Sequence, residues 1–129
     1  MAPKPRLQRS VCPVACTLDL IGDRWTLLVI RDLWAGKTTW SELADSPEGI
    51  ATNILADRLQ KLVEQGLVAR EPATGRARSY GLTRLGLSLE PVLAAMRDWG
   101  LANVAGTEAR VGSVAEERNG ASRKPRPTP

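Results

Sequence analysis

The chain has 129 residues, enough for one compact domain with a modest core. Its formal net charge of +4 at pH 7 permits a polyanionic partner without requiring one. It contains no histidine and two cysteines, so the commonest general base is absent and a structural zinc site is disfavoured. We therefore expect neither an enzyme nor a protein that depends on a metal or another cofactor.

The two ends differ in composition from the middle of the chain. Residues 1–10 carry basic side chains and no acid, and residues 106–129 are too polar and too rich in proline to bury a core. We predict a folded domain over residues 11–105 between a basic N-terminal tail and a disordered C-terminal tail. No stretch approaches the roughly 18 consecutive apolar residues of a membrane helix, and the start lacks a signal peptide's apolar core, so we expect a cytoplasmic protein without membrane contact.

Two helices are predicted first. Pro13 suits the first position of a helix, and apolar residues follow at helical spacing until Gly22 interrupts them. A second helix is predicted over residues 24–33, closed by Gly36. Residues 36–40 are β-branched and aromatic, which predicts a brief strand.

A third region predicts two more helices. Ser41 is a candidate N-cap for a short helix over residues 42–46. The next helix, residues 52–65, carries leucines along one face and ends at Gly66, a residue suited to the left-handed conformation that stops helices.

A hairpin and a final helix complete the chain. Residues 67–71 and 79–82 predict two strands around a turn that contains Pro72 and Gly75. Thr83 is then a candidate cap for a single final helix, along which an apolar stripe runs: Leu85, Leu89, Val92, Leu93 and Met96. The predicted fold is mainly α with a small β-hairpin, in the order of a winged helix-turn-helix.

The sequence also resembles a known family, the HxlR-type bacterial winged helix-turn-helix regulators. The resemblance covers residues 11–101 and rests on motifs in the right order: Cys12-Pro13, IGDRWTLLVIRDL (21–33), WSEL (40–43), GI (49–50), LADRL (55–59), EQGLV (64–68) and YGLTRLG (80–86). It implies a homodimeric transcription factor, usually a repressor, that is dimerised through its N- and C-terminal helices and binds double-stranded DNA. Such a dimer binds an inverted-repeat operator.

The helix over residues 52–65 is the predicted recognition helix. Its face opposite the leucines is either an ordinary solvated surface or, within a winged helix, a surface for DNA, which we favour: Thr52, Asn53, Ala56, Asp57, Gln60 and Lys61. Asn53 suits adenine, and Thr52 suits a phosphate or a thymine methyl group. Asp57 would accept from cytosine but repel phosphate. It departs from the family pattern, as does Ala51, which replaces the usual serine of the cap.

Three further cations are candidates for DNA contact. Arg76 and Arg78 lie at the hairpin tip, where they either keep a loop soluble or, as we favour, bind phosphate or the minor groove. Lys37 is a weaker candidate. Arg58 is predicted to pair with an acid of the same chain or with one phosphate rather than to read a base.

Cys12 and Cys16 are candidates for redox sensing. Cys12 precedes Pro13 at a helix start, where unpaired N–H groups favour the reactive thiolate. Buried packing at a dimer contact is the alternative. The resemblance implies a sensor of oxidants or electrophiles such as quinones at Cys12. Cys16, one turn later, is poorly spaced for a disulfide on an intact helix and better suited to packing.

The tryptophans leave two further alternatives open. Trp25 and Trp40 fall at predicted core positions. Trp34 and Trp99 fall near the predicted dimer helices, where they line either an interface or a cavity for a small hydrophobic effector. A protein-interaction module that keeps the fold without binding DNA is the rival function from another class.

Overall fold

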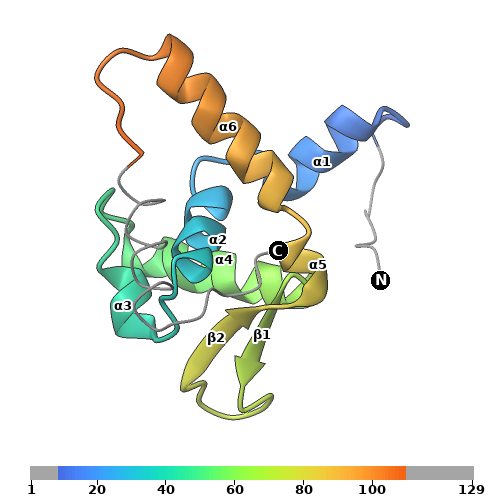
Figure 1. Ribbon diagram of the computed structural model, residues 1–129. Coiled ribbons are helices and arrows are strands. Elements are labelled where there is room, and N and C mark those ends of the chain that lie inside the picture. The colour runs from blue at the N-terminus through green and yellow to red at the C-terminus, as the bar shows by residue number, and fades with distance from the viewer. Residues whose placement is uncertain (1–8, 110–129) are drawn as a thin grey trace.

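The computed structural model describes residues 9–109, and our expectations for residues 1–8 and 110–129 lie outside this range. Its elements follow the chain in this order: α1 (Pro13–Ile21), α2 (Thr26–Trp34), α3 (Trp40–Ala44), α4 (Thr52–Glu64), β1 (Val68–Glu71), β2 (Ser79–Leu82), α5 (Arg84–Leu87) and α6 (Glu90–Asn103). Helices α2, α3 and α4 gather at the centre, with the hairpin on one side and α1 and α6 on the other (Figure 1). This arrangement confirms the predicted winged helix-turn-helix.

The core forms where the apolar faces of α2 and α4 meet the base of the hairpin. Ile30 and Leu55, one from each helix, are wholly buried, and Val68 extends the same cluster into β1. Helices as short as α2 and α4 are stabilised by the burial of these apolar faces rather than by intrinsic helix propensity. The leucine face predicted for α4 is therefore confirmed.

The predicted strand over residues 36–40 is wrong. Thr39 instead caps α3: its hydroxyl accepts from the backbone N–H of Glu42, whose carboxylate accepts from the N–H of Thr39 in return. Thr39 rather than Ser41 is therefore the cap. Trp40, predicted to lie in the core, opens this helix with 37% of its surface exposed.

The predicted single final helix is also wrong, because it breaks into α5 and α6. Thr83 caps α5, accepting from the N–H of Gly86 at 3.1 Å. α6 then starts at Glu90 with Pro91 in its first turn, where the missing N–H costs nothing. The break lets α6 turn away from the hairpin; it starts next to the end of α1 and diverges from that helix (Figure 1). Within residues 9–109, no helix is both long and apolar enough to cross a lipid bilayer.

Candidate nucleic-acid interface

The joint between α4 and the hairpin is held by several backbone contacts. Gly66 adopts φ 78°, a left-handed conformation that lets the chain leave the helix within one residue. The hydroxyl of Thr83, at the end of β2, donates to the carbonyl of Gly66 at 2.6 Å, and its N–H donates to the carbonyl of Leu67 at 3.1 Å. Both strands are thus tied to the end of α4, which fixes the angle between helix and hairpin.

Three uncharged side chains are exposed in the first half of α4. Thr52, Asn53 and Ala56 are all exposed, and Ala51, the N-cap, provides no side-chain hydrogen bond to the helix. Gln60 is also exposed, and its amide donates to the carboxylate of Glu64 at 3.2 Å. The predicted solvent-facing positions therefore share one surface.

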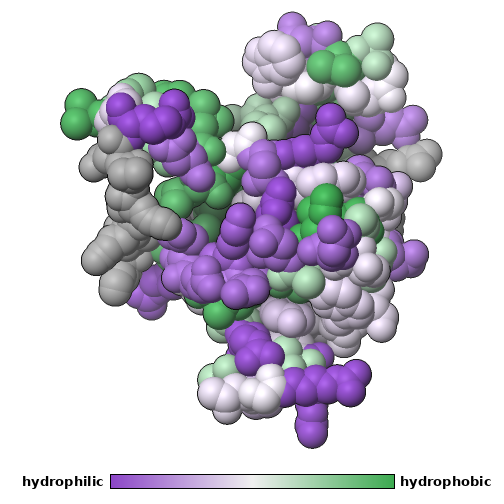
Figure 2. Space-filling model, turned by 180° about the vertical axis from the view of Figure 1, so that it is seen from behind, coloured by the Kyte–Doolittle hydropathy of each residue, from purple (hydrophilic) through white to green (hydrophobic). Residues whose placement is uncertain are grey.

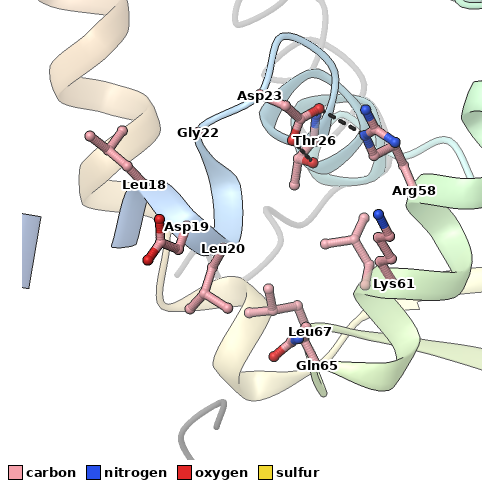
Figure 3. A pocket seen from close by; sticks show the side chains of 11 residues that line it. Leu18, Asp19, Leu20, Gly22, Asp23, Thr26, Arg58, Lys61, Gln65 and Leu67 are labelled. Carbon is pink, nitrogen blue, oxygen red and sulfur yellow. Dashed lines mark hydrogen bonds and ion pairs between the residues drawn. The ribbon is translucent and has the colours of Figure 1, made fainter. Parts of the chain in front are cut away.

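The charged residues of α4 bind one another and the loop before α2. The Arg58 guanidinium donates through Nε to Asp23 at 2.8 Å (Figure 3). Its Nη1 donates to Asp57, so Arg58 is paired with acids of its own chain, one of the two alternatives predicted for it. The ammonium group of Lys61 lies 3.4 Å from the carboxylate of the same Asp57. Partial burial opposes ionisation of Asp23, but hydrogen bonds from Thr26 and Arg58 outweigh it and hold the pKa of Asp23 well below its usual range.

The hairpin tip carries two arginines that form no ion pair within residues 9–109, Arg76 and Arg78. The loop that presents them is held by Arg70, whose guanidinium donates to the carbonyl of Ala73 at 2.8 Å and to that of Gly75 at 2.6 Å. This role of Arg70 was not predicted, because nothing in the sequence distinguishes a guanidinium turned back onto its own loop from a solvated one.

Lys37 is less available than the hairpin arginines. Its ammonium lies 3.4 Å from the carbonyl of Asp45 and 3.9 Å from the carboxylate of buried Asp32, and only 23% of the side chain is exposed. Nearby, Arg31 binds Glu48 at 2.7 Å and so holds the loop that leads into α4. Hydrogen bonding to Arg31 lowers the pKa of Glu48 to about 2.

Helices α1 and α6, together with the residue two before α1, expose an apolar surface on the side of the molecule away from the hairpin. We call it the α1–α6 face: Val11, Val14, Leu18, Met96 and Trp99. Figure 2 shows hydrophobic residues gathered over α1. A pocket of about 410 Å³ lies between the two helices, lined in part by Val14, Leu18, Val92 and Met96. Trp34, which is half-buried, and Trp99 are not part of its lining.

The two cysteines occupy different environments at the start of α1. Cys12 is the N-cap residue and is exposed, and its N–H donates to the hydroxyl of Ser10 at 3.0 Å. Cys16 is half-buried, and its thiol donates to the carbonyl of Ser10 at 3.2 Å. Neither forms a disulfide, and Cys12 is the thiol that solvent reaches more easily.

The HxlR-like helix-turn-helix family model matches residues 20–108. The chain belongs to this family. Among its relatives, the HTH-type transcriptional regulator sll1512 of Synechocystis, itself uncharacterised, is 34% identical over 92 residues, which cover 70% of this chain and 68% of the relative. YdeP of Bacillus subtilis, likewise an uncharacterised HTH-type transcriptional regulator, is 35% identical over 69% of this chain and 71% of its own.

Solved structures of similar proteins agree. PA1607, a candidate transcription factor, is 44% identical with a TM-score of 0.69 over 78% of this chain and 72% of its own. The reduced transcriptional regulator YodB of B. subtilis is 28% identical (TM-score 0.61; 77% and 100% covered), and the reduced redox regulator HypR is 32% identical (TM-score 0.62; 73% and 95% covered). This HxlR-like protein is thus a transcriptional regulator and not an enzyme, as predicted.

Proposed function

We propose that this HxlR-like regulator binds double-stranded DNA as a homodimer and represses transcription at an inverted-repeat operator. The first half of α4 enters the major groove, and the hairpin lies beside it on the phosphate backbone or in the minor groove. The observation that carries the proposal is the fixed joint at Gly66, which holds three exposed uncharged side chains of α4 beside a loop whose two arginines form no ion pair within residues 9–109. This combination suits a polyanion that is read by hydrogen bonds.

The α1–α6 face supports the homodimer. Its large apolar side chains are exposed in the single chain, an arrangement that marks an interaction site in soluble proteins. A twofold axis through this face would bury the same surface of both copies and leave the hairpin and the first half of α4 of each copy free, since these lie away from it (Figure 1). The two α4 helices would then meet successive major grooves about 34 Å apart.

The hairpin arginines provide the test of DNA binding. We expect the Arg76→Ala/Arg78→Ala double variant to weaken binding to all duplexes alike, because phosphate contacts carry no sequence information. The slope of log affinity against log salt should become shallower by about 1.8, since each neutralised phosphate contributes about 0.9. Fluorescence anisotropy with a DNA fragment from upstream of the protein's own gene, measured across salt concentrations, gives both quantities.

The control for that experiment removes the same charge elsewhere. Arg24→Ala/Arg97→Ala changes two exposed arginines outside the hairpin, one between α1 and α2 and one in α6. It should leave the salt slope unchanged. Equal salt slopes for the parent and the hairpin variant would show that the hairpin arginines do not contact DNA. A parent whose affinity does not respond to salt would favour the protein-interaction module over a DNA-binding protein.

A second proposal concerns the signal, which we assign to Cys12. It rests on the exposure of this thiol at the start of a helix of the α1–α6 face, where a modification would alter the spacing of the two α4 helices. Two similar structures support it: the quinone-bound form of YodB is 30% identical (TM-score 0.59), and the oxidised form of the redox regulator HypR is 33% identical (TM-score 0.60).

Quinone treatment separates Cys12 from Cys16 and from the pocket. We expect the parent and Cys16→Ser to lose affinity for the operator by about 5- to 150-fold, the usual range of coupling between sites, and Cys12→Ser to lose none. Anisotropy before and after treatment measures the loss, and mass spectrometry locates the adduct. A Cys12→Ser variant that releases DNA as the parent does would shift the assignment to a hydrophobic effector in the 410 Å³ pocket.

A further inference from the structure

We propose that the first half of α4 reads A·T base pairs and that no residue of this helix reads guanine. This inference rests on the proposed DNA binding and adds the class of base sequence that the operator contains. It follows from which side chains of α4 are already engaged within the protein and which remain exposed.

Arg58 is the single arginine of α4, and arginine is the commonest guanine reader because two of its N–H groups can bind O6 and N7 together. Here Nε donates to Asp23 at 2.8 Å and Nη1 donates to Asp57. Asp23 is itself fixed by the backbone N–H groups of Trp25 and Thr26 at 3.0 and 3.2 Å. With 22% of its side chain exposed, Arg58 is held against Asp23 of its own subunit (Figure 3).

The charged side chains at the centre of α4 are also engaged with one another. Asp57, the residue that would accept from cytosine, binds Arg58 and lies 3.4 Å from Lys61. Lys61 belongs to the second half of the helix, whereas recognition helices contact base edges through their N-terminal residues. We therefore assign Lys61 to a phosphate contact rather than to a base. The carboxylate of Asp57 positions the side chains of Arg58 and Lys61.

The groups left for the groove are an amide, a hydroxyl and two methyl groups, and only the amide pairs with two atoms of one base. Asn53 is exposed, and an asparagine amide pairs with N6 and N7 of adenine. Thr52 and Ala56 are exposed on either side of it and offer methyl groups that suit the methyl of thymine. Arg76 and Arg78 favour the same composition, because A·T-rich segments narrow the minor groove and attract arginine.

Selection from randomised duplexes with the full-length protein tests the inference. We expect the recovered half-sites to carry A·T pairs under α4, and replacement of the central pair by G·C to weaken binding of the parent by about 5- to 150-fold. Asn53→Ala should fold as the parent does and lose most of that discrimination. Asn103→Ala, the same change at the exposed end of α6, is the matched control and should keep it.

The outcomes separate the two proposals. If no duplex is enriched and none binds, the proposal that this protein binds DNA is itself contradicted. If duplexes bind but the half-sites require guanine under α4, or if Asn53→Ala discriminates as the parent does, DNA binding stands and the assignment of A·T reading to α4 is overturned.

Discussion

The Leu18→Glu variant is expected to be monomeric and to bind the operator at least about 100-fold more weakly than the parent. Leu18 lies in α1 with 55% of its surface exposed and lines the pocket between α1 and α6. In the proposed dimer it is buried against the partner, where an unpaired carboxylate costs several kcal/mol. Loss of the second half-site removes an avidity gain of about 10² or more.

Two measurements check this expectation. Sedimentation equilibrium gives the oligomeric state, and anisotropy gives the affinity for the operator. Leu87→Glu makes the same change on α5, outside the α1–α6 face, and should remain dimeric. A Leu18→Glu protein that sediments as a dimer would show that this face is not the interface.

The Leu55→Ala variant is expected to lose about 2–5 kcal/mol of the free energy of unfolding. Leu55 is wholly buried between α4 and the rest of the core, and alanine would leave a cavity beneath the recognition helix. Urea denaturation followed by circular dichroism measures the loss, at fixed protein concentration because dimerisation contributes to the apparent stability.

The control for this change lies on the same helix. Asn53→Ala alters an exposed side chain and should shift the free energy of unfolding by no more than about 0.5 kcal/mol. The two variants thereby separate stability from base reading. If Leu55→Ala unfolds at the parent's urea concentration, the described core does not support α4.

Elements encoded by local signals could be predicted from the sequence. The leucine spacing of α4, the stop at Gly66 and the turn residues Pro72 and Gly75 each act within a few residues. Their order along the chain was enough to predict a winged helix. The same reasoning predicted for Arg58 an acid of the same chain or one phosphate as partner, and the structure shows the acid Asp23.

Two errors arose where one local signal outweighed another. The β-branched residues at 36–40 suggested a strand, but Thr39 and Glu42 form a capping box whose spacing was visible in the sequence. The apolar stripe from Leu85 to Met96 suggested one helix, although Pro91 marks a new start. In both places a capping or first-turn residue determined the outcome.

Long-range contacts could not be predicted. Asp23, the partner of Arg58, is 35 positions away in the sequence, and only the packing of α2 against α4 brings them together. Lys37 shows the reverse case, since a cation expected to face DNA is turned toward Asp32 and Asp45. Which charges of a recognition surface are available depends on such pairs, and they require the folded structure.

Hydroxyl-radical footprinting of the selected operator tests most directly the claim that two α4 helices bind one duplex. A dimer joined through the α1–α6 face should protect two zones, centred about one helical turn apart and related by the twofold symmetry of the sequence. Protection confined to one zone at saturating protein, or protection with no such spacing, would contradict it.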